Sequence, residues 1–200
     1  NSKVTKAIEY SAVASNTSFS ADAVSANAVA VGTTFTLTTG TDSFSGGDTA
    51  DVFNAPNSAG TAAAQTFNSG DGLSGGDGQD QLNATIGAAT TYVANNVSGI
   101  ETISATFSAA GTVSLLGSDG VTLVQSSAST ANGIFTQIGS AAVGAKAGDT
   151  ASNATFTYTA EALTGSSDSV ALEAANVTGA ATLTVDPASG TNGAETIVLT

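Results

Sequence analysis

The alternation of apolar and polar positions changes at Gly32 and divides the chain into a helix-like beginning and a strand-rich remainder. Before Gly32, apolar residues recur at the three- and four-residue spacing of a helix, as in NSKVTKAIEYSAVAS and SADAVSANAVAV. After it, TTFTLTTG places Phe35 and Leu37 on one side and threonines on the other, as in a strand. We therefore expect residues 1–31 to be a helical segment, the end of an upstream helical domain, and the rest to be mainly β.

Short strand-like runs follow one another through the rest of the chain, separated by Gly, Ser, Asn and Asp. They include GTVSLLG, GVTLVQS, NATFTYTA, DSVALEA, ATLTVD and AETIVLT. This pattern is typical of a β-sandwich or a β-solenoid. Lys146, which lies between two glycines, is expected to be a solvated loop residue. The aromatic residues of this region are expected to pack between strands: Tyr92, Phe107, Phe135, Phe156 and Tyr158.

An internal repeat lies in the first third of the chain. TDSFSGGDTADVFN (41–54) aligns without gaps on GDGLSGGDGQDQLN (70–83), and the apolar pairs Phe44/Leu73 and Phe53/Leu82 correspond. Within each copy, an Asp–x–apolar element recurs after nine residues. The two copies also hold 6 of the 16 acidic residues of the chain, so acidic side chains are concentrated here.

The repeat contains the nonapeptide G-G-x-G-x-D-x-U-x of calcium-binding β-rolls, in which U is a large apolar residue. Residues 75–83 match it at every fixed position, and residues 46–54 match it except at Thr49. Glycines allow the turn its backbone conformation, and Asp supplies the anionic oxygen that calcium prefers. A single GGDG is more often a flexible linker, but the repeated nonapeptide favours a calcium site. The candidate ligands are Asp42, Gly46, Asp48, Asp51, Gly70, Asp71, Gly75, Asp77, Gly78 and Asp80.

The spacing of the aspartates predicts how the two copies stack. A β-roll coil takes two nonapeptides, so an insertion of about 11 residues within NAPNSAGTAAAQT is needed to keep the coils in phase. Asp71 then lies beside Asp42 at one edge, and Asp80 beside Asp51 at the other. Coils stack about 4.8 Å apart. Two carboxylates at that separation repel each other unless a cation lies between them.

The composition excludes several classes of function. The chain has no Cys and no His, and its three basic residues are all lysines, so zinc, iron–sulfur and haem sites and His-dependent nucleophilic catalysis lack their residues. A net charge of −13 argues against a nucleic-acid partner. No apolar stretch approaches the roughly 20 residues of a membrane span. Charged residues make up only 10% of the chain, against roughly 25% in ordinary soluble domains.

Three segments resemble the repeats-in-toxin (RTX) proteins of Gram-negative bacteria, and among them the calcium-dependent surface-layer (S-layer) proteins of the Caulobacter type. They are FTLTTGTDSFSGGDTADVFNA (35–55), SGDGLSGGDGQDQLNATI (69–86) and VSGIETISATF (97–107). In that family a G-[IVF]-E-T strand follows the RTX block. The resemblance implies an RTX calcium β-roll over residues 32–86. It also implies a Ser/Thr/Ala-rich parallel β-solenoid, or β-helix, over residues 87–200 that continues beyond the fragment.

The resemblance also implies a function. The expected protein is a non-enzymatic structural component of a bacterial surface layer, secreted through a type I apparatus that reads a C-terminal signal beyond residue 200. It would fold outside the cell with Ca²⁺ and assemble with its own copies into a lattice or filament. Cell-surface polysaccharide, reached through upstream regions, is a second candidate partner. Two alternatives stay open: a calcium-dependent RTX adhesin, and the secretion or folding module of an enzyme whose catalytic domain lies elsewhere.

Overall fold

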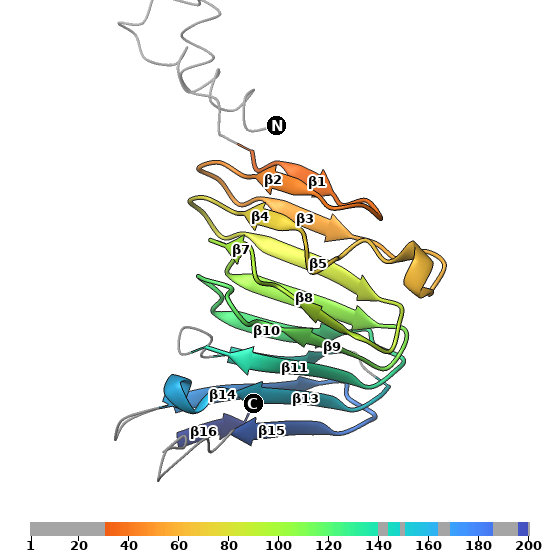
Figure 1. Cartoon of the computed structure of the whole chain (residues 1–200). Helices are drawn as coiled ribbons and strands as arrows, with labels where there is room; N and C mark the ends of the chain where they lie inside the picture. Colours follow the sequence, from red (N-terminus) through yellow and green to blue (C-terminus); the bar gives the residue numbers. More distant parts are fainter. Residues whose placement is uncertain (1–30, 140–143, 149–150, 164–168, 186–195, 200) are drawn as a thin grey trace, which may run out of the picture. The chain divides into compact units, whose positions relative to one another are not determined.

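The computed structural model describes residues 31–139, 144–148, 151–163, 169–185 and 196–199. The helical segment predicted for residues 1–31 lies, apart from Val31, outside the described residues. Residues 32–200 form one compact unit, and all the strand pairs described in it are parallel (Figure 1). Because a sandwich of hairpins requires antiparallel neighbours, the parallel pairing identifies a β-solenoid.

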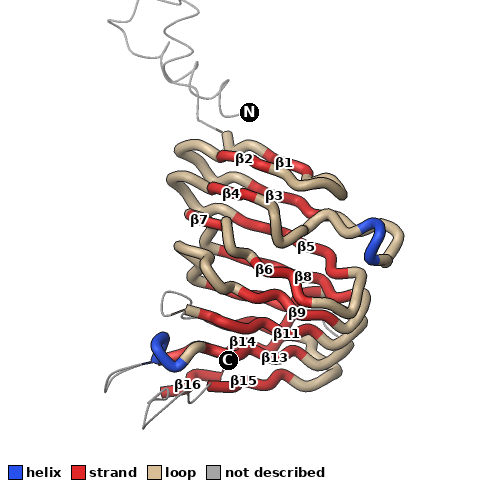
Figure 2. Tube along the Cα trace, in the orientation of Figure 1, coloured by secondary structure: helices blue, strands red, loops and turns tan. Residues whose placement is uncertain are grey.

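Three sheets form the walls of the solenoid. The largest contains β1 (Thr34–Thr36), β3 (Val52–Ala55), β5 (Gln81–Ile86), β8 (Thr102–Phe107), β10 (Leu123–Ser127), β12 (Gly144–Gly148), β14 (Ser169–Ala175) and β16 (Thr196–Leu199). The second contains β6 (Thr91–Val93), β9 (Gly111–Ser114), β11 (Gly133–Ile138), β13 (Ala154–Tyr158) and β15 (Ala181–Val185). The third contains β2 (Ser43–Ser45), β4 (Gly72–Ser74) and β7 (Val97–Ser98). Helical structure among the described residues is limited to two 3₁₀ turns, η1 (Ala62–Ala64) and η2 (Ala160–Leu163) (Figure 2).

The strand register shows how long each coil is. Phe35 pairs with Phe53 and Phe53 with Leu82, so the first coil advances 18 residues and the second 29. Leu82 then pairs with Ile103, and Ile103 with Val124, so the next two coils advance 21 residues each. The insertion of about 11 residues predicted in the second coil is therefore confirmed. The largest sheet continues from β5 to β8 across the end of the nonapeptide repeat.

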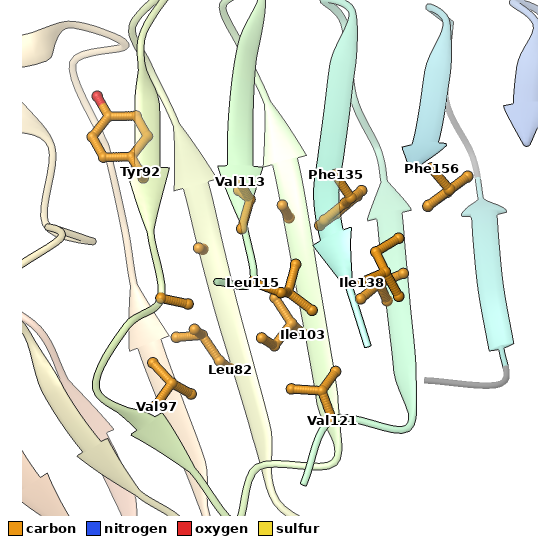
Figure 3. Close-up of a cluster of buried hydrophobic side chains, with 14 of the residues drawn as sticks. Leu82, Tyr92, Val97, Ile103, Val113, Leu115, Val121, Phe135, Ile138 and Phe156 are labelled. Carbon is orange, nitrogen blue, oxygen red and sulfur yellow. The ribbon is translucent and has the colours of Figure 1, made fainter. Parts of the chain in front are cut away.

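Apolar side chains stack in columns between the walls because each inward position meets its counterpart in the next coil. Leu82 of β5 and Ile103 of β8 are fully buried (Figure 3). On the second sheet, Phe135 of β11 stacks on Phe156 of the neighbouring β13 at 5.4 Å, and it meets Phe107 of β8, on the largest sheet, edge to face at 5.7 Å. All the aromatic residues expected to pack between strands are buried, as the sequence predicted: Tyr92, Phe107, Phe135, Phe156 and Tyr158.

The insertion between β3 and β4 is anchored to the solenoid through buried polar groups. The Gln65 side chain donates a hydrogen bond to the carbonyl oxygen of Thr85 at 2.9 Å and accepts one from the Gly87 amide at 3.0 Å. Asn57 donates to the same Gln65 side chain at 3.0 Å, and Phe67 is fully buried. Gln65 thus satisfies two backbone groups at the end of β5, Asn57 bonds to the Gln65 side chain, and the buried Phe67 joins the excursion to the core.

Replacing Phe135 with alanine should lower the free energy of unfolding by about 3–5 kcal/mol, because it leaves a cavity between Phe107 and Phe156. Ile134 is the matched control, since it precedes Phe135 on the same strand but points outward with 38% of its surface exposed. Ile134→Ala should cost less than about 1 kcal/mol. Urea denaturation of the full chain in calcium measures both values. Similar losses for the two variants would contradict the inward placement of Phe135.

Candidate calcium site

The two nonapeptide turns stack directly on each other. The first loop (46–51) joins β2 to β3, and the second loop (75–80) joins β4 to β5. The strands on both sides pair in the same 29-residue register. Between the loops, the Gly46 amide donates to the carbonyl oxygen of Ser74 at 2.7 Å, and the Asp77 amide donates to that of Gly47 at 2.9 Å. The predicted pairing of the two copies is therefore present along their whole length.

Glycine is required where the loops come closest. A Cβ at Gly46 would lie 2.1 Å from the carbonyl oxygen of Gly75 and 2.3 Å from Oδ2 of Asp51. Gly76 has a φ of 98°, which side-chain-bearing residues rarely adopt. Glycine at position 46 thus lets a carboxylate oxygen and a backbone carbonyl oxygen approach the backbone at the same point.

Asp42 and Asp71 form the buried acidic pair at one edge of the coils, with 8% and 2% of their surfaces exposed. The Asp42 amide donates to Asp71 Oδ1 at 2.9 Å, and the Asn68 amide donates to Asp71 Oδ2 at 2.7 Å. Asp42 Oδ2 in turn accepts from the Thr38 amide at 2.7 Å. Each carboxylate therefore closes its own turn, and that of Asp71 also reaches back to the preceding coil. The candidate ligand Gly70 lies exposed next to this pair.

Asp51 and Asp80 form the second pair, at the opposite edge, and each is only 1% exposed. The Asp51 amide donates to Asp80 Oδ1 at 2.6 Å, and Asp51 accepts from the amide of Thr33 and, at 2.8 Å, from that of Gly47. Asp80 Oδ2 is buried and has no hydrogen-bond partner. An unsatisfied buried carboxylate oxygen is costly unless a cation or a proton compensates it.

The column of acidic side chains continues one coil further than the sequence analysis predicted. The Asp80 amide donates to Oε2 of Glu101 at 2.7 Å, just as the Asp51 amide donates to Asp80. The sequence signal was present, because Glu101-Thr102-Ile103 repeats the acidic–x–apolar order of Asp80-Gln81-Leu82. It was missed because the turn before Glu101 is not a nonapeptide.

The remaining candidates lie at the outer ends of the stacked loops. Asp48 and Asp77 are exposed, as is Gly78, whereas Gly75 is buried. The structure thus gathers Gly46, Asp48, Asp51, Gly75, Asp77, Gly78 and Asp80 on one edge and Asp42, Gly70 and Asp71 on the other.

No basic side chain of the described residues neutralises these carboxylates. Lys146, the one basic residue in the described part of the chain, pairs with Glu173 at 2.8 Å. This corrects the expectation of a solvated loop lysine, because Lys146 lies in β12 and meets Glu173 of the neighbouring β14 in register. Within the part of the chain that the structure describes, the buried aspartates are therefore like charges without a basic counter-ion.

Burial and hydrogen bonding shift the pKa values of this cluster in opposite directions. Burial raises the pKa of Asp80 above its ordinary value of 3.8, and the charges of Glu101, Asp51 and Asp77 raise it further. Burial likewise raises the pKa of Asp71, with a contribution from Asp42. The pKa of Asp51 is lowered instead, mainly because the Gly47 and Thr33 amides donate to its carboxylate. Asp80 and Asp71 thus gain most from a proton or a cation.

The residues present fit a calcium ion. No group of three or more His, Cys, Asp or Glu side chains is arranged around one point in the described part of the chain. Calcium, however, also binds backbone carbonyl oxygens, and the stacked loops place the Gly75 carbonyl oxygen close to Asp51 Oδ2. An oxygen-binding cation would also satisfy Asp80 Oδ2, which has no hydrogen-bond partner.

In calcium-free buffer, β structure should increase as the pH falls from 7 toward 4. The pKa values of Asp71 and Asp80 are higher in the folded chain than the 3.8 of the unfolded chain. Between pH 3.8 and those raised values, the folded chain therefore binds more protons than the unfolded chain. Protonation stabilises the fold in this range, and this stability is lost as the pH rises. The pKa shift of Asp51 is in the opposite direction, so protonation of Asp51 destabilises the fold, and it does so only when the pH falls below 3.8. Circular dichroism across this range measures the effect.

Asp80→Asn should flatten the pH response, whereas Asp119→Asn, which changes an exposed turn residue, should not. A β signal that falls steadily from pH 7 to pH 4 in calcium-free buffer would contradict the assignment of buried, unpaired carboxylates.

No protein-family model matches this chain, and no curated protein matches it either. Within the described residues, no helix has the length and apolar character needed to cross a membrane. The candidate function therefore rests on the chemistry of the two stacked loops and on the parallel β-solenoid that stacks them.

Proposed function

We propose that this chain is a calcium-dependent structural module of a bacterial surface layer, in which Ca²⁺ orders the first coils and the solenoid walls pack against other copies. The observation that carries the proposal is the pair Asp51 and Asp80, buried one coil apart, to which the described residues offer no basic partner. Such an arrangement is unfavourable by itself and becomes favourable once a divalent cation is bound.

The oxygen atoms for calcium would come from both side chains and backbone. Asp51 and Asp80 would hold the ion at one edge, together with the carbonyl oxygens turned toward Gly46 and Gly76, and Asp42 and Asp71 would hold an ion at the other. The ion would supply positive charge beside carboxylates that no basic side chain of the described residues neutralises. Its binding energy adds to the folding energy, because the site exists only when the coils are stacked.

The outward faces of the solenoid support an assembly role. On the largest sheet, the outward column one coil after another reads Asn54, Asn83, Ser104 and Gln125, joined by hydrogen bonds of 3.1 Å between Asn83 and Asn54 and 3.2 Å between Gln125 and Ser104. Asn54, Asn83 and Ser104 also border a groove. The next two positions of the column are Lys146 and Glu173, whose opposite charges pair with each other at 2.8 Å. Because the first four positions are uncharged and the next two carry no net charge, this face is suited to packing against another copy.

The proposed role is structural rather than enzymatic, since the chain has no His, Cys or Arg from which the common catalytic arrangements are built. Secretion to the surface of a Gram-negative bacterium belongs to the same proposal and rests on the RTX-like nonapeptides. A calcium-dependent adhesin or the folding module of a secreted enzyme would use the same calcium chemistry. Assembly is what separates these functions.

Calcium should raise the melting temperature of the chain and its β content between micromolar and millimolar concentrations. Binding to the folded state alone adds about 2.7 kcal/mol at a hundredfold excess over Kd. The double variant Asp51→Asn/Asp80→Asn removes the carboxylates of one edge and should lose most of the calcium-induced rise in melting temperature that this edge contributes. Asp119→Asn should keep the full rise. Circular dichroism melting measures both. A melting temperature that does not respond to calcium in the unmodified chain would rule out the calcium-dependent role.

Assembly should require calcium and be only weakly sensitive to monovalent salt, because uncharged faces and bridging ions would hold the copies together. Electron microscopy of the longest available chain, with and without calcium, tests this. Regular sheets or filaments that appear only with calcium would support a surface layer. Persistent monomers at high protein concentration in millimolar calcium would instead favour an adhesin or a secretion module.

A further inference from the structure

The coil that follows the second loop carries a shorter turn. Ser74 pairs with Ser98 and Gln81 with Thr102, so residues 75–80 of the second loop face only residues 99–101 in the next coil. Gly99 has a φ of 57°, and the Gly75 amide donates to the carbonyl oxygen of Ser98 at 2.9 Å. The nonapeptide edge thus ends against a tight glycine turn, which we name the junction turn (99–101).

Two oxygen atoms converge at this junction. A Cβ placed on Gly75 would lie 1.7 Å from the carbonyl oxygen of Gly99 and 2.4 Å from Oδ2 of Asp80. The same arrangement occurs one coil earlier, where the point beside Gly46 is 2.1 Å from the Gly75 carbonyl oxygen and 2.3 Å from Asp51 Oδ2. The junction turn therefore reproduces the oxygen pair found between the two nonapeptide loops.

The two positions differ in one respect. Asp51 Oδ2 accepts a hydrogen bond of 2.8 Å from the Gly47 amide, whereas Asp80 Oδ2 is buried with no partner at all. An anionic oxygen buried without a donor points to a ligand, because leaving it unpaired is costly. The oxygen without a partner is the one that faces the junction turn.

Glu101 brings a second carboxylate to the same place. Its Oε2 accepts from the Asp80 amide at 2.7 Å, and the next residue of this column one coil later is an uncharged threonine, Thr122, so the acidic column ends at Glu101. Among the described residues no basic side chain reaches it, because Lys146 is paired with Glu173. A hard cation that prefers several oxygen ligands suits this combination of two carboxylates and a carbonyl.

We infer that the junction turn forms a further calcium site, with oxygen ligands from the Asp80 and Glu101 carboxylates and the Gly99 carbonyl. The inference rests on the proposed calcium binding by the nonapeptide loops but concerns a position outside them. A cation here links the last nonapeptide coil to the first coil of the following solenoid. Calcium binding then also stabilises the coil after residue 86, because each coil of a solenoid is stabilised chiefly by its neighbours.

The test compares calcium binding by Glu101→Gln, Asp51→Asn and the unmodified full chain. Glutamine keeps the oxygen that accepts from the Asp80 amide but removes the charge. Isothermal titration with Ca²⁺ should show that Glu101→Gln binds one ion fewer per chain, or binds it at least about tenfold more weakly. Asp119→Asn is the control, because it removes one charge from an exposed turn one coil further along and should bind like the unmodified chain.

Melting temperatures with and without calcium separate a ligand from a merely structural residue. Glu101→Gln should melt no lower than the unmodified chain in chelator, since one repelling charge is gone, and should gain less from calcium. An equal loss of melting temperature in both conditions would overturn the junction site and make Glu101 a structural hydrogen-bond acceptor.

The remaining outcomes distinguish the two proposals. If Glu101→Gln binds calcium like the unmodified chain while Asp51→Asn binds less, the junction site is wrong and the nonapeptide sites stand. If the unmodified chain binds no calcium, both proposals fail together.

Discussion

Parallel stacking in register is the constraint on which the rest of this structure depends. Each strand pairs with the strand one coil away, so every side chain meets the side chain at the same position of its neighbour. Where those positions are apolar, as at Phe53, Leu82 and Ile103, the stacking builds a continuous core. Where they are acidic, the same stacking forces like charges together. The favourable and unfavourable contacts of the solenoid thus have one geometric origin.

The acidic column shows how far the backbone can compensate for that repulsion. Main-chain amides donate to Asp51, Asp80 and Glu101 from the preceding coil, and each such charge-assisted bond stabilises the ionised form. At Asp51 these bonds outweigh burial, and its pKa is lowered. At Asp80 they do not, because one oxygen has no donor, and its pKa is raised. The need for a cation is therefore concentrated at one carboxylate.

Beyond the junction turn, the next coil does not extend the acidic column, because Thr122 stands one coil after Glu101. Gly99 and Gly120 each have a positive φ, and the residues that follow them, Ile100 and Val121, are apolar and buried at this edge. Coils beyond the junction are thus held by ordinary core packing. The coils proposed to depend on calcium and the coils that follow them share one continuous sheet, which suits a module that folds from one end.

The sequence by itself determined the coil register of the first third of the chain. The 29-residue repeat, the nonapeptides and the aspartate spacing predicted the stacked loops, the inserted residues and the inward Phe and Leu positions, because these features are periodic and local. The strand-like runs after residue 87 predicted most later strands, although they left a sandwich open as an alternative. Only the parallel pairing of the structure decided between the two.

Tertiary structure decided what periodicity cannot encode. Gln65 and Asn57 lie in a stretch that the sequence predicts to be an excursion, and they are buried where the Gln65 side chain bonds to the carbonyl oxygen of Thr85 and to the Gly87 amide. Lys146 finds Glu173 through strand register rather than through proximity in the sequence. Glu101 joins the aspartate column although its turn is shorter than a nonapeptide, since what aligns it is the pairing of β5 with β8. The spacing of residues within a sequence repeat determines which of them can stack on each other. Contacts between coils of different length depend instead on the strand register, which only the tertiary structure shows.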